Sequence, residues 1–205
     1  MMPVAAVLFD ADGVVQTTPA DWYARWGALI ENPADTDHFL KDIFAAELPY
    51  LTGGPGLGTA IGQVLKKWGS TRPVEDALGL WTHVTPDPAM LALVDATRRT
   101  GATVALATNQ QPHRLNYMKE TLGYSEQFDH LFVSCEMGVA KPAADFFLQI
   151  VERLDQQPGR LLFIDDNADN VSAAREAGLN AVLFHLREGP DQLATLLGKH
   201  GIRLG

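Results

Sequence analysis

Residues 7–15 of the chain are VLFDADGVV, an apolar run that ends abruptly at two carboxylates and a glycine. The run extends a continuous apolar segment from residue 4, which is typical of a strand buried on both faces of a parallel sheet. Ligands of such sheets bind beyond the carboxyl ends of the strands, where Asp10 and Asp12 lie. Residues two apart in extended backbone share a face, so both carboxylates can flank one reacting centre. Gly13 is expected to turn the chain with a positive φ or a close backbone approach.

Similar continuous apolar runs recur along the chain, and helical patterns separate the later ones. Asp87 can cap a helix N-terminus, whereas Gly101 and Gly178 suit the positions just beyond helix ends. From about residue 86 onward, strand and helix alternate, which predicts an α/β fold with a doubly wound, Rossmann-like parallel sheet. The predicted strands cover residues 4–9, 103–107, 130–133, 161–164 and 181–184.

The stretch between the first strand and residue 85 has helical periodicity and no convincing strand. Amphipathic helices are indicated around residues 22–30, 39–48 and 61–68. We therefore expect an α/β core of residues 1–16 and 85–205 and a helical cap of residues 17–84. The glycine-rich TGGPGLG at residues 52–58 has no preceding strand and no following Lys-Ser or Lys-Thr pair, so it is predicted as a turn between cap helices. The cap aromatics are expected to form mainly the cap core: Trp22, Tyr23, Trp26 and Trp68.

The composition excludes several classes of protein. Among 205 residues, 25 acidic and 16 basic side chains give a net charge of −9, and the basic residues are scattered. This balance argues against nucleic acid or an anionic membrane as a partner. No apolar run approaches the roughly 18 residues of a membrane helix, and no signal-peptide pattern is present, so a cytoplasmic location is expected. The single cysteine, Cys135, agrees with a reducing compartment and is more typical of a buried apolar residue than of a nucleophile.

Polar residues also follow other predicted strands. Thr108 and Asn109 come directly after the run ending at residue 107, and Asp165 and Asp166 come after the run ending at residue 164. Lys141 lies in the loop GVAKP before a helix. One such residue would be ordinary as a helix cap or turn. Together, the clustered carboxylates require a cation and their oxygens favour Mg²⁺, while the lysine, hydroxyl and amide can bind a phosphoryl group that a carboxylate can attack.

Four of these segments resemble the motifs of the haloacid dehalogenase (HAD) superfamily, most of whose members are phosphatases. FDADG, ALATN, AKP and FIDDNADN match its first to fourth motifs in order and spacing along nearly the whole chain. The helical stretch corresponds to the cap that this family inserts after its first strand. The form DDNADN resembles in particular the branch of small sugar-phosphate phosphatases and the N-terminal phosphatase domain of soluble epoxide hydrolase.

The resemblance implies separate roles for the two carboxylates of the first motif. Asp10 would be the nucleophile that forms an aspartyl-phosphate. Asp12 would be the general acid that protonates the leaving oxygen and then the base that activates water. Both would contribute to the Mg²⁺ site, Asp12 through its main-chain carbonyl. Dehalogenases of this superfamily do not keep an aspartate at the position of Asp12, so this residue favours a phosphatase.

The resemblance also implies roles for the later motifs. Thr108 and Lys141 would bind the phosphate, and Lys141 would offset the charge of the nucleophile. Asp166 would be the principal metal ligand of the fourth motif, with Asp165 close by, and Asn170 would support that loop.

The predicted function is Mg²⁺-dependent hydrolysis of a small phosphorylated metabolite, such as a sugar phosphate. A phosphomutase or phosphotransferase would use the same residues and differ only in the acceptor. A receiver-like signalling domain also groups acids, a threonine and a lysine around Mg²⁺, but its phosphorylated aspartate follows a middle strand, and here the third predicted strand is followed by SCEMG. A non-catalytic phospho-ligand-binding protein would be expected to lack Asp10 or Lys141. An apolar cap surface or a sheet edge could support a homodimer.

Overall fold

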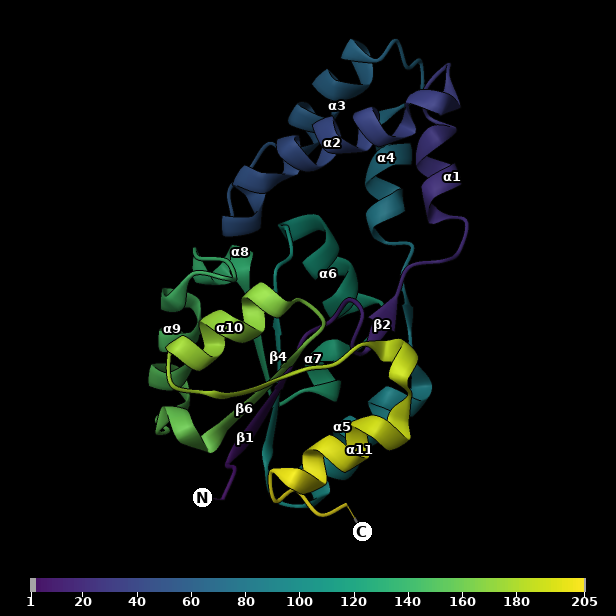
Figure 1. Cartoon of the computed structure of the whole chain (residues 1–205). Coiled ribbons are helices and arrows are strands. Elements are labelled where there is room, and N and C mark those ends of the chain that lie inside the picture. The colour runs from purple at the N-terminus through teal and green to yellow at the C-terminus, as the bar shows by residue number, and fades with distance from the viewer. Residues whose placement is uncertain (1–2, 205) are drawn as a thin grey trace.

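The computed structural model describes residues 3–204, which form a parallel sheet with helices on both faces and a helical unit beyond its carboxyl edge (Figure 1). The sheet has five strands in the order β5-β4-β1-β6-β7. Their bounds are β1 (Ala6–Phe9), β4 (Thr103–Thr108), β5 (His130–Val133), β6 (Leu161–Asp165) and β7 (Asn180–Leu183). The predicted doubly wound α/β fold is therefore confirmed, and each of these five strands agrees with the sequence prediction to within two residues.

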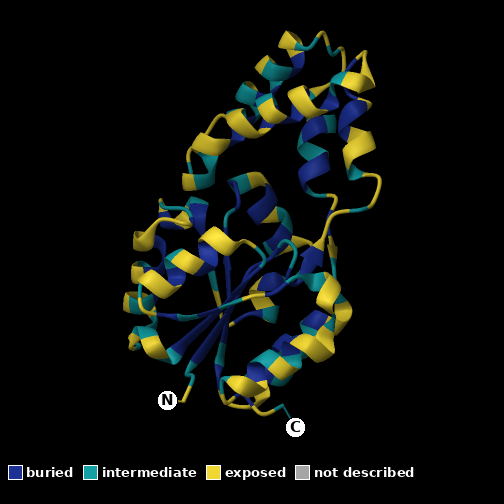
Figure 2. Ribbon diagram, viewed as in Figure 1, coloured by how far each residue is buried: buried dark blue, intermediate teal, exposed yellow. Residues whose placement is uncertain are grey.

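Alternate residues of β1 point into two separate apolar cores. Val7 and Phe9 belong to the core formed with α5 (Pro88–Arg99) and α11 (Pro190–Lys199). Leu8 belongs to the core on the opposite face, together with residues of the helices that cover that face, α9 (Ala144–Leu154) and α10 (Ala168–Glu176). Figure 2 shows the strands buried between these layers. Because both faces of β1 are covered, each of its positions is apolar.

The centre of the sheet is also the point where the chain changes its direction of winding. β1 pairs in parallel with β4 on one side and with β6 on the other. Such a switch point leaves a crevice at the carboxyl ends of the strands, and Asp10 follows β1 directly into it. The shorter core elements are α6 (Pro112–Glu120), α7 (Tyr124–Gln127), α8 (Ser134–Met137), η3 (Pro158–Arg160) and η4 (Leu186–Glu188).

The cap is a helical unit with its own apolar core (Figure 1). It contains α1 (Trp22–Gly27), η1 (Pro33–Asp35), α2 (Thr36–Glu47), η2 (Leu48–Thr52), α3 (Leu57–Lys67) and α4 (Val74–Trp81). The sequence predicted the first three α-helices and missed α4, whose eight residues include a glycine and give only a short pattern. The prediction that the first helix reaches residue 30 was wrong. That helix ends at Gly27, where the chain turns and a Cβ atom would lie 2.5 Å from the hydroxyl oxygen of Thr36.

Two short antiparallel strands connect the cap to the core. These strands, β2 (Gln16–Thr17) and β3 (Thr85–Pro86), lie at the two boundaries predicted for the cap of residues 17–84. The glycine-rich segment forms the turn between η2 and α3, as predicted, and also reaches the core. A Cβ atom on Gly53 would lie 2.6 Å from the carbonyl oxygen of Cys135 in α8. Among residues 3–204, no helix has both the length and the apolar character needed to cross a bilayer.

A Gly53→Ala substitution should loosen the contact between the cap and α8. The added Cβ would collide with the Cys135 carbonyl, and the backbone at φ +97° disfavours any side chain. Gly54→Ala is the matched control, because Gly54 has φ +106° but open space around the added atom. Hydrogen–deuterium exchange of residues 134–137 should be faster in Gly53→Ala than in Gly54→Ala. Equal exchange would show that this contact does not hold the cap.

Candidate active site

The side chain of Lys141 joins the ends of three neighbouring strands. Its ammonium group donates hydrogen bonds to Asp10 Oδ1 at 2.8 Å, to Asp165 Oδ2 at 2.6 Å and to the carbonyl oxygen of Ala107 at 2.9 Å. These acceptors belong to the ends of β1, β6 and β4. Burial alone would lower the pKa of Lys141, but Asp10 and Asp165 raise it above its ordinary value, so the ammonium group stays charged.

Three carboxylates at this edge form a candidate metal site. Asp10, Asp165 and Asp166 each offer an oxygen, and these oxygens lie within 4.8 Å of one another. Burial raises the pKa of Asp10 to about 6 even with Lys141 beside it, and burial together with Asp165 raises the pKa of Asp166. One ammonium group therefore leaves this cluster short of positive charge. An all-oxygen donor set with excess negative charge suits a hard divalent cation such as Mg²⁺.

The two acids of the fourth motif differ in their surroundings. Asp165 is fully buried, and it accepts hydrogen bonds from the Asn170 side chain at 3.1 Å to both oxygens and from the Asn167 main chain at 2.8 Å. The Asp166 side chain is 36% exposed. Asp165 is thus held in place by the protein, whereas Asp166 faces the open side of the site. Their predicted roles as metal ligands agree with this placement and stay predictions.

Gly13 lies against Asp166. It has φ +72°, and a Cβ atom at this position would lie 2.1 Å from Asp166 Oδ2. The expected positive φ and close approach are both confirmed. The glycine after the first motif therefore makes room for a carboxylate of the fourth motif.

The carboxylate of Asp12 lies apart from the acidic cluster. It accepts hydrogen bonds from Gln16 Nε2 at 3.0 Å, Gln110 Nε2 at 3.0 Å and an Arg114 guanidinium nitrogen at 2.6 Å. Its side chain is 42% exposed, against 10% for Asp10. Asp10 thus points into the buried ion pair, whereas Asp12 points toward the cap, which suits one attacking group and one proton-transferring group.

The second motif contributes one hydroxyl and one positioning side chain. Thr108 ends β4, is buried, and accepts a hydrogen bond from Gln110 Nε2 at 3.3 Å. Asn109 was predicted to bind phosphate. Its side chain instead exchanges two hydrogen bonds with the main chain of Lys141, at 2.8 and 2.9 Å. The structure therefore gives Asn109 a part in positioning Lys141, and direct phosphate binding by Asn109 stays a prediction.

Sequence reasoning missed the partners of Asp12. The Arg114 side chain is about nine-tenths buried and lies in the first turn of α6. A positive charge is unfavourable near a helix N-terminus, so this position could have indicated a carboxylate partner. The neighbouring His113 is exposed, and its Nε2 lies 3.2 Å from the Leu78 carbonyl oxygen of α4.

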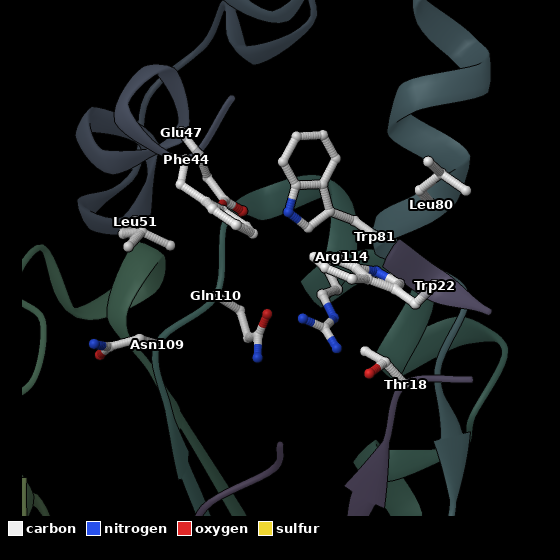
Figure 3. A pocket seen from close by; sticks show the side chains of 10 residues that line it. All are labelled: Thr18, Trp22, Phe44, Glu47, Leu51, Leu80, Trp81, Asn109, Gln110 and Arg114. Carbon is white, nitrogen blue, oxygen red and sulfur yellow. The ribbon is translucent and has the colours of Figure 1, made fainter. Parts of the chain in front are cut away.

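A pocket of about 180 Å³ lies between the cap and the core (Figure 3). Its lining residues are Thr18, Trp22, Phe44, Glu47, Leu51, Leu80, Trp81, Asn109, Gln110 and Arg114. Trp26 is fully buried in the cap core, as predicted for the cap aromatics. Trp22 packs against the same core and also lines the pocket. The prediction was wrong for Tyr23, which is exposed.

The cap contributes one buried acid to this pocket. Glu47 is only 9% exposed, and its burial raises the pKa to about 7, although Arg114 and Trp81 act in the opposite direction. From the sequence, Glu47 was expected only to belong to the cap helix of residues 39–48. It lies on a helix, and the side of the helix that faces the core depends on how the cap packs, so the sequence did not identify it as a site residue.

The parallel sheet, with a lysine and clustered carboxylates at the carboxyl ends of its strands, is the arrangement of one class of hydrolase. The family model described as haloacid dehalogenase-like hydrolase matches residues 4–178. The chain therefore belongs to the haloacid dehalogenase-like hydrolase family, and the resemblance drawn from its motifs is confirmed.

Individual relatives and structures agree with this membership. A sesquiterpene phosphatase from Aspergillus oryzae is 30% identical over 112 residues, which are 55% of this chain and 55% of that protein. A ribulose-1,5-bisphosphate 5-phosphatase from Halopiger xanaduensis is 26% identical over 91% of this chain and 87% of its own length. The magnesium complex of a HAD family enzyme from Bacteroides thetaiotaomicron has the same fold, with a TM-score of 0.79, 18% identity and coverage of 94% and 98% of the two chains.

Because the acidic cluster is predicted to hold Mg²⁺, a Gly13→Ala substitution is expected to weaken Mg²⁺ binding. The added Cβ would displace the Asp166 carboxylate, and changes beside metal ligands typically cost about 10–100-fold in metal affinity. Gly69→Ala is the control, because Gly69 has a similar φ of +69° and no atom within 4 Å of the added Cβ. Calorimetric titration with Mg²⁺ should show the loss in Gly13→Ala only. The same Mg²⁺ affinity in both variants would contradict the role assigned to Gly13.

A Glu47→Gln substitution should stabilise the protein at neutral pH. Because folding raises the pKa of Glu47 from 4.5 to about 7, the folded protein keeps a proton that the unfolded chain has already lost. Wild type should therefore lose stability relative to Glu47→Gln as the pH rises through this range, by on the order of 3 kcal/mol. Urea unfolding of both proteins between pH 4 and pH 8 measures this difference, which should vanish near pH 4. Parallel curves would show that Glu47 is not held in a desolvated state.

Proposed function

We propose that this protein is a Mg²⁺-dependent phosphohydrolase that acts on a small phosphomonoester through an aspartyl-phosphate formed on Asp10. The main support is the buried pair of Asp10 and Lys141, which places a carboxylate at the switch point of the sheet beside a fixed positive charge. Family membership and the phosphatase names of the relatives point the same way. A sugar phosphate is the substrate predicted from the fourth motif, but the apolar lining of the pocket between cap and core favours a less polar alcohol.

In the first half of the reaction, a carboxylate oxygen of Asp10 attacks the phosphorus of the substrate. The bond between phosphorus and the ester oxygen breaks, and Asp12 transfers its proton to the departing alcohol. Lys141 and the Thr108 hydroxyl bind phosphoryl oxygens and lower the cost of the charge that develops on them. When bound by Asp10, Asp165, Asp166 and the main-chain carbonyl of Asp12, Mg²⁺ would neutralise negative charge on the phosphoryl group.

In the second half, a water molecule attacks the phosphorus of the aspartyl-phosphate, and Asp12 accepts a proton from that water. The bond between phosphorus and Asp10 breaks, which releases inorganic phosphate and restores both carboxyl groups. Gln110 and Arg114 hold the Asp12 carboxylate beside the pocket in which the alcohol lies. The division between an inward-facing Asp10 and an outward-facing Asp12 thus serves both halves of the reaction.

Asp10→Asn should abolish turnover while leaving the fold intact, because an amide is a poor nucleophile toward phosphorus. Asp12→Asn should lower kcat by at least about 10²–10⁴-fold, the usual contribution of acid–base catalysis. Phosphate release from a panel of phosphomonoesters measures both effects, and a chelator should stop the wild-type reaction.

Asp155→Asn is the control for these variants, because Asp155 is an exposed residue after α9, before the amino end of β6 and so at the edge of the sheet opposite the site. It should retain wild-type turnover. Wild-type rates in Asp10→Asn would rule out the covalent mechanism. Transfer of phosphate to an added alcohol in preference to water would instead identify a phosphotransferase.

A further inference from the structure

The pocket between cap and core opens beside the proposed proton donor. Gln110 and Arg114 line the pocket and also donate hydrogen bonds to the Asp12 carboxylate. If Asp12 protonates the ester oxygen, that oxygen lies at the core side of the pocket. The alcohol part of the substrate must then extend toward the cap, into the space seen in Figure 3.

The walls of this space are mainly apolar and aromatic. Trp22 and Phe44 are stacked, with ring centroids 6.1 Å apart and an angle of 13° between their planes. Trp81 and two leucines complete the cap side. Phe44 is 40% exposed although it is a large apolar residue of the cap, and its position on the pocket accounts for this exposure. A polyhydroxylated sugar would leave hydroxyl groups without partners against these walls, which is unfavourable.

The volume limits the size of the group that enters. A closed apolar cavity of about 150 Å³ accommodates benzene, so a pocket of about 180 Å³ accommodates one six-membered ring with a small substituent. Fused ring systems would have to project beyond the pocket.

Two largely buried polar residues, Glu47 and Arg114, line this space. Glu47 takes part in none of the ion pairs found among residues 3–204. Its carboxylate turns toward Trp81 in Figure 3. Within the same residues, Arg114 Nε is buried and has no hydrogen-bond partner. A buried carboxylate is stabilised by a hydrogen-bond donor, and a ligand can supply that donor.

We infer that the substrate is the phosphomonoester of an alcohol that carries a single flat apolar ring with one hydrogen-bond donor. The ring lies in the pocket against Trp22, Phe44 and Trp81, and its donor binds the Glu47 carboxylate. This inference rests on the proposed phosphohydrolase function, because Asp12 defines which end of the pocket holds the ester oxygen.

Three esters of primary alcohols test the inference: 3-hydroxybenzyl phosphate, benzyl phosphate and glucose 6-phosphate. Their affinity is measured first by calorimetry on Asp10→Asn in the presence of Mg²⁺, so that binding is separated from turnover. The expected order of affinity is 3-hydroxybenzyl phosphate, then benzyl phosphate, then glucose 6-phosphate, with at least about a tenfold difference between the first and the last. The same order is expected for kcat/KM in wild type.

Variants assign the selectivity to particular residues. Glu47→Met should abolish the difference in affinity between 3-hydroxybenzyl phosphate and benzyl phosphate. Methionine has a similar size but cannot accept a hydrogen bond from the ring hydroxyl as a carboxylate does. Phe44→Ala should weaken binding of both ring-containing esters by about tenfold and leave glucose 6-phosphate unaffected. Tyr23→Ala is the matched control for Phe44, because Tyr23 is an exposed cap aromatic that does not line the pocket.

The outcomes separate this inference from the proposed function. Tighter binding of glucose 6-phosphate than of either ring-containing ester to Asp10→Asn, or no effect of Glu47→Met on the ratio between those two, would overturn the inference and leave the hydrolase mechanism standing. Wild-type hydrolysis by Asp10→Asn would overturn the mechanism whatever the order of affinity. Absence of both binding and turnover for all three esters would overturn both.

Discussion

The ammonium group of Lys141 contacts two buried carboxylates, and the arrangement of the site depends on these contacts. This group contacts Asp10 and Asp165, which lie at the ends of two paired strands. The main chain of Lys141 is held by two hydrogen bonds with the Asn109 side chain. Breaking such a buried pair typically costs about 3–5 kcal/mol, because the remaining charge has no partner. One lysine still leaves three clustered carboxylates with excess negative charge, which Mg²⁺ would relieve. The excess negative charge therefore supports a cation site, and Lys141 together with that cation would offset the charge of a phosphate at the same edge of the sheet.

The cap and the core contribute different properties, and Asp12 lies where they meet. The core supplies the buried ion pair and the acidic cluster, whereas the cap supplies the apolar walls of the pocket and Glu47. Gln16 lies in the strand that leads into the cap, donates a hydrogen bond to Asp12 and accepts one from Tyr124 at 2.8 Å. The residue proposed to transfer the proton is thus one hydrogen bond away from the strand that leads into the cap.

The motif residues could be located from the sequence because a parallel sheet has a simple geometry. Continuous apolar runs identify buried strands, and their carboxyl ends meet at one edge, so Asp10, Thr108 and Asp165 were expected together although they lie far apart in the chain. Glu47 and Arg114 could not be located in this way. Both lie on helices, and which face of a helix meets a pocket depends on how the helix packs. The packing of the cap on the core is set by contacts such as that of Gly53 with α8.

The sequence by itself determined the fold class, the strands, the helical insertion and the residues at the strand ends, because each of these follows from local periodicity and from strand direction. Only the tertiary structure decided which of these residues contact one another and which way their side chains point. It showed that Gly13 makes room for Asp166, that Asn109 holds Lys141, and that Asp12 turns away from the acidic cluster toward Arg114. These features depend on distances of a few ångströms between segments remote in sequence, and such distances arise only when the two apolar cores and the cap pack together.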